Sequence, residues 1–304
     1  MSATVAIAKD LQDISNAIDE ALSHFDLGPI VHHKIVAVKP NDTWASDDDR
    51  TGVTQPDTLR AVLRYLKNYG PRELIVTGGS GAGETDEIFK TAGLMDVVHE
   101  EGATFVDHNR PPFQSVELEY RPAADVAGPQ KNVMVNPRVL EYEALIVLSQ
   151  LKLHRTATAT LALKNIAMSY PAADYYGHPR SKEKHENEFY EDMHSFIAAM
   201  AKRFPIDLAI TAGHPAMIAS GPLGGKAVET GIVIASTDAV AADVVGAKLL
   251  GFNVQAVRHL WEAKRLGLGE TDTDEVSFPG MDLRTAIQDF TEAAYGKRMT
   301  YESV

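Results

Sequence analysis

The sequence predicts an α/β protein with a mostly parallel or mixed central sheet and helices on both faces. Three observations support this fold class. Runs of apolar and β-branched residues, such as 144–148, alternate along the chain with amphipathic helical stripes. A glycine-rich turn at 78–83 joins one of these strands to a helix, and polar residues follow where other strands end. Continuously apolar strands that alternate with helices are typical of sheets covered on both faces.

Length and composition are ordinary for a globular protein. The 304 residues are 44% hydrophobic and 23% charged, which allows a substantial core. We expect one α/β domain over 1–304 with two additions. Prolines and short β patches predict an inserted hairpin segment at about 109–137. Residues 169–188 form a long polar loop, of the kind that usually serves as a lid, a binding loop or a disordered segment.

Charge and cysteine content exclude several functional classes. With 29 Lys and Arg against 42 Asp and Glu, the net charge is −13, which argues against a nucleic-acid partner because phosphate binding needs a basic surface. The chain has no cysteine, so thiol catalysis, thiolate zinc sites and an iron–sulfur cluster on its own cysteines are excluded. The most apolar window, 231–250, contains charged residues that a bilayer would resist. We expect a cytoplasmic protein with no membrane partner, and a homo-oligomer is compatible with the sequence.

The first half of the chain is predicted to alternate strands with helices. Leu59, Leu63 and Leu66 form an apolar helical stripe. Pro56 suits the first turn of this helix and Gly70 suits its C-terminal end. The predicted strands are 5–8, 35–38, 74–77 and 104–107, and the predicted helices are 11–25, 56–70, 85–91 and 94–101.

The second half continues this alternation. A buried strand, 144–148, precedes a Thr- and Ala-rich segment, 156–165, that can be helical. Thr237 or Asp238 can cap a nearly apolar helix that follows. The other predicted strands are 206–210 and 232–235, and the predicted helices are 189–202, 238–250 and 254–266. A second glycine-rich turn is expected after 211–214, and the tail 276–304 adds a short strand and a helix.

Cationic side chains follow the strand at 144–148. Lys152, His154 and Arg155 come where a strand of an open α/β sheet ends, which is where such folds bind ligands. If 150–154 is still extended, Lys152 and His154 share one face. The alternative is a solvated loop before a polar helix.

Hydroxyl and amine groups continue this pattern. If 156–165 is helical, Thr156, Thr160 and Lys164 recur every fourth residue and share a face, with Asn165 next to it. Two lysines, a histidine and two hydroxyls could then converge on one point. Such a group suits a small-molecule anion, either a carboxylate or a phosphate.

Further anion-binding groups are expected at the glycine-rich turns and at the end of the second strand. A strand, a glycine-rich loop and a helix present backbone N–H groups to anions, but 78–83 is neither a P-loop nor a GxGxxG motif, and a tight turn explains it equally well. Lys39 lies at a strand end because Pro40 stops strand pairing there. The expected substrate-binding residues are Lys39, Asn41, Gly79, Ser80, Gly81, Arg155, Thr160, Asn165 and Gly221.

Four histidines offer an alternative, a metal site. His178 and His185 lie in the long polar loop, and His194 follows in the next helix. Each histidine alone is typical of an exposed or structural residue. Together with His154 they could hold a divalent transition metal, because neutral imidazoles bind such ions without cysteine.

A single carboxylate interrupts the apolar helix at 238–250. Asp243 would be costly to bury unless it is paired or hydrogen-bonded. One interpretation is a hydrogen bond from a neighbouring loop. The other is that Asp243 orients a lysine or a histidine of the pocket.

Several segments, spread nearly end to end, match a known pattern. They are KPN at 39–41, TQPDTLRAVLRYLKNYG at 54–70, the strand and glycine turn at 74–83, LSQLKLHRTATATLALKN at 148–165, SGPLGG at 220–225 and STDAVAADVVGAKLLG at 236–251. On these segments the chain resembles the domain-of-unknown-function 362 family. The resemblance implies an α/β fold, but no activity, because the family has no settled one. Some members carry an added cysteine-rich ferredoxin segment, which this chain lacks.

One position departs from the family pattern. The family tends to have an Asp-Gly pair after the strand at 206–210, whereas this chain has Ala212, Gly213 and His214. If that Asp serves a metal or a substrate, its role is lost here or taken by His214.

The leading hypothesis is an enzyme that acts on a small anionic metabolite by acid–base chemistry. His154 is the first candidate for the acid or base, because its ordinary pKa is near neutrality. Lys152 or Lys164 could also act as base, since neighbouring cations lower a lysine pKa. Proton abstraction next to a carbonyl, as in an isomerase or epimerase, fits these groups best, although hydrolysis and metal-assisted chemistry also fit. The alternatives are a histidine-based metal- or cofactor-binding protein without turnover, and a scaffold with a vestigial pocket.

Overall fold

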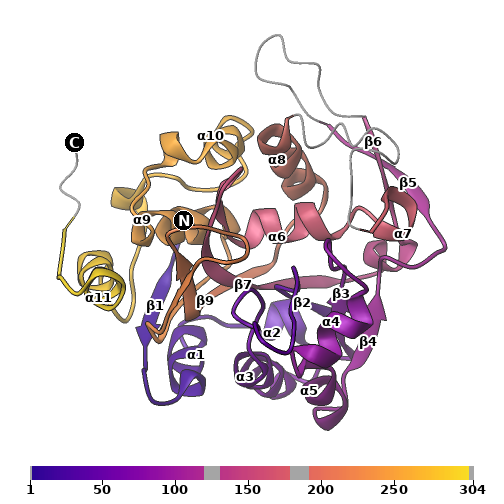
Figure 1. The fold of residues 1–304 in the computed structure, drawn as a ribbon, viewed down its shortest axis with the longest axis horizontal. Helices are drawn as coiled ribbons and strands as arrows, with labels where there is room; N and C mark the ends of the chain where they lie inside the picture. Colours follow the sequence, from indigo (N-terminus) through magenta and orange to yellow (C-terminus); the bar gives the residue numbers. More distant parts are fainter. Residues whose placement is uncertain (1, 120–130, 179–191, 301–304) are drawn as a thin grey trace.

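A nine-stranded mixed sheet forms the centre of the computed structural model, which describes residues 2–119, 131–178 and 192–300 (Figure 1). Its strand order is β1-β11-β9-β7-β2-β3-β4, with β10 paired to β9 and β8 paired to β7. The predicted α/β class is therefore confirmed. The strands of the main path are β1 (Ala6–Lys9), β2 (Ile35–Pro40), β3 (Glu73–Gly78), β4 (Thr104–Asp107), β7 (Ala144–His154), β9 (Leu208–Ile218) and β11 (Ile232–Ser236).

The middle of the sheet is parallel. β9, β7, β2, β3 and β4 run in the same direction, whereas at one side β11 pairs antiparallel with β9, and β1 pairs antiparallel with β11. The strands β2, β3 and β7 therefore end at the same edge. Ligands of open α/β sheets bind at this edge.

Helices cover both faces of the sheet, and each face has its own apolar core (Figure 1). One face packs against α1 (Ile14–Leu22), α2 (Gly28–Val31), α3 (Pro56–Lys67), α4 (Thr85–Thr91) and α5 (Leu94–Glu100). The other packs against α6 (Ala162–Ser169), α8 (Met193–Arg203), α9 (Ala239–Leu249), α10 (Arg258–Arg265) and α11 (Leu283–Tyr295). A short helix, α7 (Ala173–Tyr176), lies in the predicted polar loop. Among the described helices, none is both long and apolar enough to cross a membrane.

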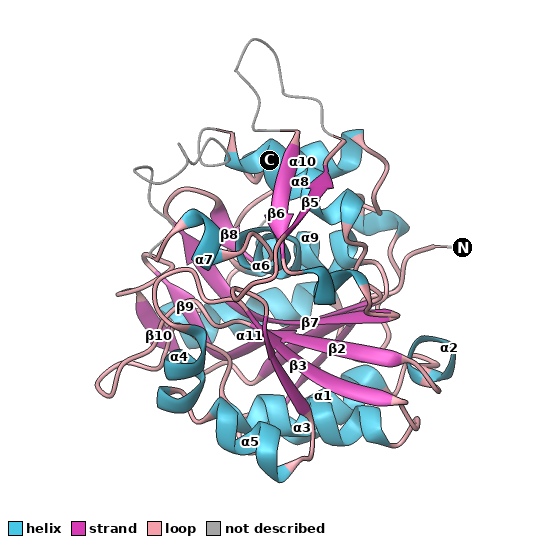
Figure 2. Cartoon of the chain, turned by 90° about the vertical axis from the view of Figure 1, so that its right-hand side faces the viewer, coloured by secondary structure: helices cyan, strands magenta, loops and turns pink. Residues whose placement is uncertain are grey.

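The predicted hairpin near 109–137 is present. β5 (Gln114–Glu117) pairs antiparallel with β6 (Asn132–Val135), and Figure 2 shows the pair set apart from the main sheet. Its alternate residues Val116, Val133 and Val135 are buried in the core of the α6 face. Burial of one side of each strand explains the alternating sequence.

The possible helix over 156–165 is present only in its last part. β7 continues to His154, and Thr158–Thr160 returns antiparallel to it as β8. The helix α6 begins only at Ala162. The ring of His154 accepts hydrogen bonds from the Thr156 and Ala157 amides, which stabilises the tight turn, and threonine favours strands.

Other boundaries also differ from the prediction. β9 runs on through His214 to Ile218, because β11 and then β10 (Lys226–Val228) pair with it. The expected helix at 254–266 is divided into a 3₁₀ turn, Val254–Ala256, and α10. In the tail, Ser277 and Gly280 make isolated bridges in place of a strand.

Candidate functional site

Lys152 lies at the end of β7, fully buried. Its ladder partner on β8 is Thr160, and its relative exposure is 0%. The Lys152 ammonium donates to Asn41 Oδ1 at 2.7 Å, to the Gly52 carbonyl at 2.8 Å and to Thr43 Oγ1 at 3.4 Å. All three acceptors are neutral oxygens. These contacts position the amine, but they add no negative charge that would keep it protonated.

Lys39 reaches the same edge from the neighbouring strand β2. It is also fully buried, and it donates to Asp42 Oδ1 at 2.6 Å and to Asn165 Oδ1 at 3.3 Å. The other oxygen of Asp42 accepts the Gly79 amide at 2.7 Å. Asp42 therefore joins the end of β2 to the glycine-rich loop. Asp42 is not among the residues predicted for the site, although it directly follows the KPN segment.

Helix α6 adds Lys164 and Asn165, both buried. The Asn165 amide nitrogen lies 3.5 Å from the Leu148 carbonyl and from Ser149 Oγ on β7. We call Lys39, Lys152 and Lys164, with Asn41, Asp42 and Asn165, the lysine cluster. The structure thus brings together the three predicted lysines, at the edge where β2 and β7 end.

The environment of Lys152 changes its ionisation. Burial, with a further contribution from the Lys164 charge, lowers the pKa of Lys152 from 10.5 to about 7, while Asp42 opposes the shift. A lysine with such a pKa is partly neutral at physiological pH. It can then accept a proton or donate one.

His154 is less suited to act as a base. Its Nδ1 accepts hydrogen bonds from the backbone amides of Thr156 and Ala157, each at 3.1 Å. Burial and the nearby charges of Lys164 and Lys152 lower the pKa of His154 to about 2. The ring therefore stays neutral, with its proton on Nε2, and can only donate. This geometry favours Lys152 over His154 as the acid–base group.

The first glycine-rich loop is tied into the protein. The Gly79 amide donates to Asp42, and the Ser80 amide donates to Thr85 Oγ1 at 3.2 Å. A Cβ at Gly79 would lie 1.9 Å from His108 Nε2, so only glycine fits there. Gly79, Ser80 and Gly81 are predicted to bind an anion, but the amides of Gly79 and Ser80 donate to side chains of the protein itself. These hydrogen bonds support the tight-turn interpretation more than direct anion binding.

The second glycine-rich turn packs against the end of β7. The Gly221 carbonyl accepts the Arg155 amide at 3.0 Å, and a Cβ at Gly221 would lie 1.8 Å from the Leu153 carbonyl oxygen. Leu223 of this turn also lies against Gly52. Gly221 therefore supports the strand that carries Lys152, while the Arg155 side chain is exposed.

Buried polar atoms near the lysine cluster lack partners. One is Oγ1 of Thr160, the residue of β8 that pairs with Lys152. Another is Oε1 of Gln150, which precedes Lys152 by two residues on β7. Buried polar atoms are nearly always hydrogen-bonded in folded proteins. Such atoms can accept a hydrogen bond from a ligand or a water molecule.

Comparison with known proteins identifies the family of this chain. The model of the family described as "Domain of unknown function (DUF362)" matches residues 36–248. The chain belongs to this family. The match runs from β2 to α9 and includes the whole lysine cluster. The DUF362 chain is also similar to "Thylakoid-associated protein sll1697" of Synechocystis sp. (strain ATCC 27184 / PCC 6803 / Kazusa), with 23% identity over 255 residues, covering 84% of this chain and 74% of the relative.

The predicted metal-binding histidines have separate partners in this DUF362 protein. His178 Nε2 lies 2.9 Å from Asp174 Oδ1, whereas His194 Nδ1 lies 3.4 Å from Nδ1 of the buried His259. His185 falls outside the described residues. Within the part of the chain that the structure describes, no group of three or more His, Cys, Asp or Glu side chains could hold a metal ion.

His214, which follows Ala212 and Gly213 on β9, forms two ion pairs. Its two ring nitrogens lie 2.9 Å from Asp57 Oδ2 and 2.8 Å from Glu229 Oε2. The Asp57 and Glu229 carboxylates raise the pKa of His214 to about 9, against the effect of burial. This arrangement joins β9 to the start of α3 and gives His214 a structural role.

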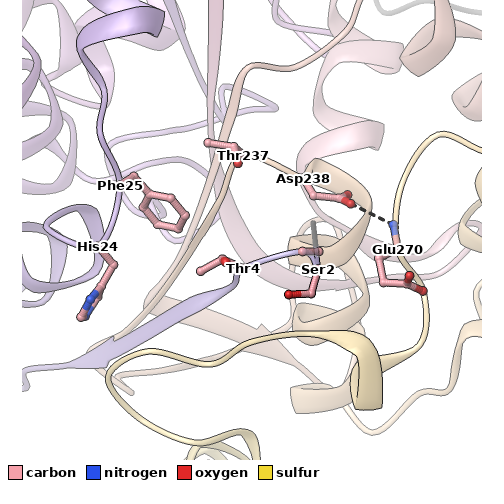
Figure 3. Close-up of a pocket in the computed structure, with 8 residues that line it drawn as sticks. Ser2, Thr4, His24, Phe25, Thr237, Asp238 and Glu270 are labelled. Carbon is pink, nitrogen blue, oxygen red and sulfur yellow. Dashed lines mark hydrogen bonds between the residues drawn. The ribbon is translucent and has the colours of Figure 1, made fainter.

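A separate cavity of about 560 Å³ lies at the opposite edge of the sheet (Figure 3). It is found beyond the end of β11, which is antiparallel to β9. Phe25 lines it on one side, and Asp238 and Glu270 line it on the other. Both oxygens of Asp238 accept backbone amides, from Ala241 and from Glu270. No motif in the sequence indicates this cavity, because its lining comes from distant segments.

Proposed function

We propose that this DUF362 protein is an enzyme that acts on a small anionic metabolite, a carboxylate or a phosphate, by acid–base chemistry at the lysine cluster. The observation that carries the proposal is the buried amine of Lys152, which contacts only neutral oxygens and lies near two further lysines. Proton abstraction next to a carbonyl, as in an isomerase or epimerase, is the reaction class that these groups suit best.

Each group of the cluster has a role in this proposal. The neutral amine of Lys152 accepts the proton from carbon and later returns it. Lys39 and Lys164 supply positive charge for the anionic substrate and for the enolate oxygen that develops. His154 Nε2–H and the Thr160 hydroxyl are donors for substrate oxygens, and Asn41 orients Lys152.

Substrate entry requires the loop at 43–52 to move. Lys152 is closed to solvent, and Gly52 and Thr43 of this loop supply two of its three acceptors. Release of these contacts frees the amine at the moment when the substrate arrives. In the closed state, burial is the main cause of the low pKa of Lys152.

The test is exchange of a carbon-bound proton with solvent. The protein is incubated in D₂O with a panel of 2-hydroxy acids, 2-oxo acids, sugar acids and sugar phosphates, and deuterium incorporation is followed by NMR. We expect incorporation into at least one compound with the wild type and a loss of at least about 100-fold with Lys152→Met, the usual scale of general base catalysis.

A matched variant completes this experiment. Lys297 is exposed, so Lys297→Met makes the same substitution away from the cluster and should leave exchange unchanged. Equal exchange in wild type and Lys152→Met on a compound that the protein turns over would refute the assignment. A panel without any exchange would refute proton abstraction from these substrate classes.

A further inference from the structure

The helix that carries Lys164 and Asn165 has no N-terminal cap of its own. α6 begins at Ala162, and its N-cap residue is Leu161, whose side chain makes no capping hydrogen bond. The first amides of a helix need acceptors from elsewhere when they are buried. The position of Lys164 therefore depends on the group that supplies those acceptors.

Asp243 of α9 supplies them. Its Oδ1 accepts a hydrogen bond from the Ala162 amide at 2.8 Å, and its Oδ2 accepts one from the Leu163 amide at 2.9 Å. The carboxylate is fully buried and comes from about 80 residues further along the chain. A buried carboxylate is costly without hydrogen bonds, and a helix N-terminus attracts negative charge. The carboxylate and the start of α6 therefore stabilise each other.

Gly246 allows this approach. A Cβ there would lie 2.8 Å from Leu161 Cδ2 and 3.5 Å from Leu151 Cδ1. Gly246 follows Asp243 by three residues, so both lie on the face of α9 that meets the start of α6. The two positions together set how closely α9 packs against the residues before Lys164.

We infer that Asp243 is a positioning residue of the lysine cluster, because it caps α6 from another helix and thereby fixes Lys164 and Asn165 against Lys152 and Lys39. Lys164 follows the capped amide of Leu163 directly, and Asn165 contacts the Lys39 ammonium. A change at the first turn of α6 therefore moves both side chains. The functional meaning of this positioning rests on the proposed function, but the positioning itself can be measured without a substrate.

The measurement is the NMR titration of Lys152 in protein labelled with ¹³Cε-lysine, with its signal assigned by Lys152→Met. The variant Asp243→Asn keeps the size of the side chain, but its amide nitrogen cannot accept the second backbone N–H. Displacement of Lys164 then reduces the repulsion that Lys152 feels. We expect the titration midpoint of Lys152 to rise by roughly one pH unit, the scale of one lost neighbouring charge.

The control is Val245→Ala on the same helix. Val245 is fully buried, so this variant loses packing but keeps the cap, and it should leave the Lys152 midpoint unchanged. If Asp243→Asn does not fold, Asp243→Ser takes its place, because its hydroxyl puts no NH2 group against a backbone N–H of α6. A Lys152 midpoint equal to that of the wild type in the Asp243 variant, or an equal shift in Val245→Ala, would overturn the inference.

The titration tests the positioning role of Asp243, and the exchange assay tests the proposed function, so either claim can be refuted without the other. A raised midpoint in Asp243→Asn without proton exchange by the wild type would support positioning and refute the proposed function. An unchanged midpoint with an active wild type would refute positioning alone.

Discussion

The ionisation of Lys152 should be visible in the pH dependence of stability. In the unfolded chain this lysine keeps its proton up to about pH 10.5, whereas in the folded protein it releases the proton at about pH 7. Between these values the unfolded state binds one more proton, so the free energy of unfolding rises with pH. The full slope is about 1.4 kcal/mol per pH unit. From pH 7, where titration is half complete, to pH 9, the gain is about 2 kcal/mol.

The variant Lys152→Met removes this dependence. It also leaves Asn41 Oδ1 and the Gly52 carbonyl without their donor, but that cost is independent of pH. Urea unfolding of both proteins at pH 7, 8 and 9 should therefore show the wild type gaining about 2 kcal/mol relative to the variant. Lys297→Met, at an exposed position, should track the wild type. A difference between wild type and Lys152→Met that stays constant with pH would contradict a lowered Lys152 pKa.

The remaining predictions concern structural contacts of single residues. Neighbouring carboxylates raise the pKa of His214 from 6.5 to about 9, so its ion pairs stabilise the fold fully below pH 6.5 and lose this contribution as pH rises through 9. In thermal melts, His214→Gln should remove that loss, and an unchanged pH profile would argue against the pairs with Asp57. Gly79→Ala places a Cβ 1.9 Å from His108 Nε2 and should destabilise the protein by about 1–3 kcal/mol in urea unfolding. Gly83→Ala, in the same loop with ordinary contacts, is the control, and equal effects of the two variants would refute this steric argument.

Much of the fold follows from patterns within single segments. The strands at 35–40, 73–78 and 104–107 lie close to their predicted positions, and so do the helices that follow the first two, because apolar runs and helical stripes determine them locally. The meeting of Lys39 and Lys152 also follows, since residues at the ends of parallel strands meet at one edge of the sheet.

The features that sequence reasoning missed depend on pairing over long distances. Alanine favours helix and threonine favours strand, so the segment after His154 is ambiguous until β7 pairs with Thr158–Thr160. The sequence shows that Asp243 needs a partner, but not that the partner is the start of a helix about 80 residues away. His154 was selected for its ordinary pKa, and only the fold shows that backbone amides bind its Nδ1.

The central claim is that Lys152 is a buried amine able to exchange a proton near neutral pH. The most direct measurement is the titration of its ¹³Cε signal in the wild-type protein, compared with the signals of exposed lysines such as Lys297. The structure predicts a midpoint near pH 7 for Lys152, well below the ordinary lysine value of 10.5. A midpoint near the ordinary lysine value of 10.5 would contradict the claim and remove the acid–base role proposed for this residue.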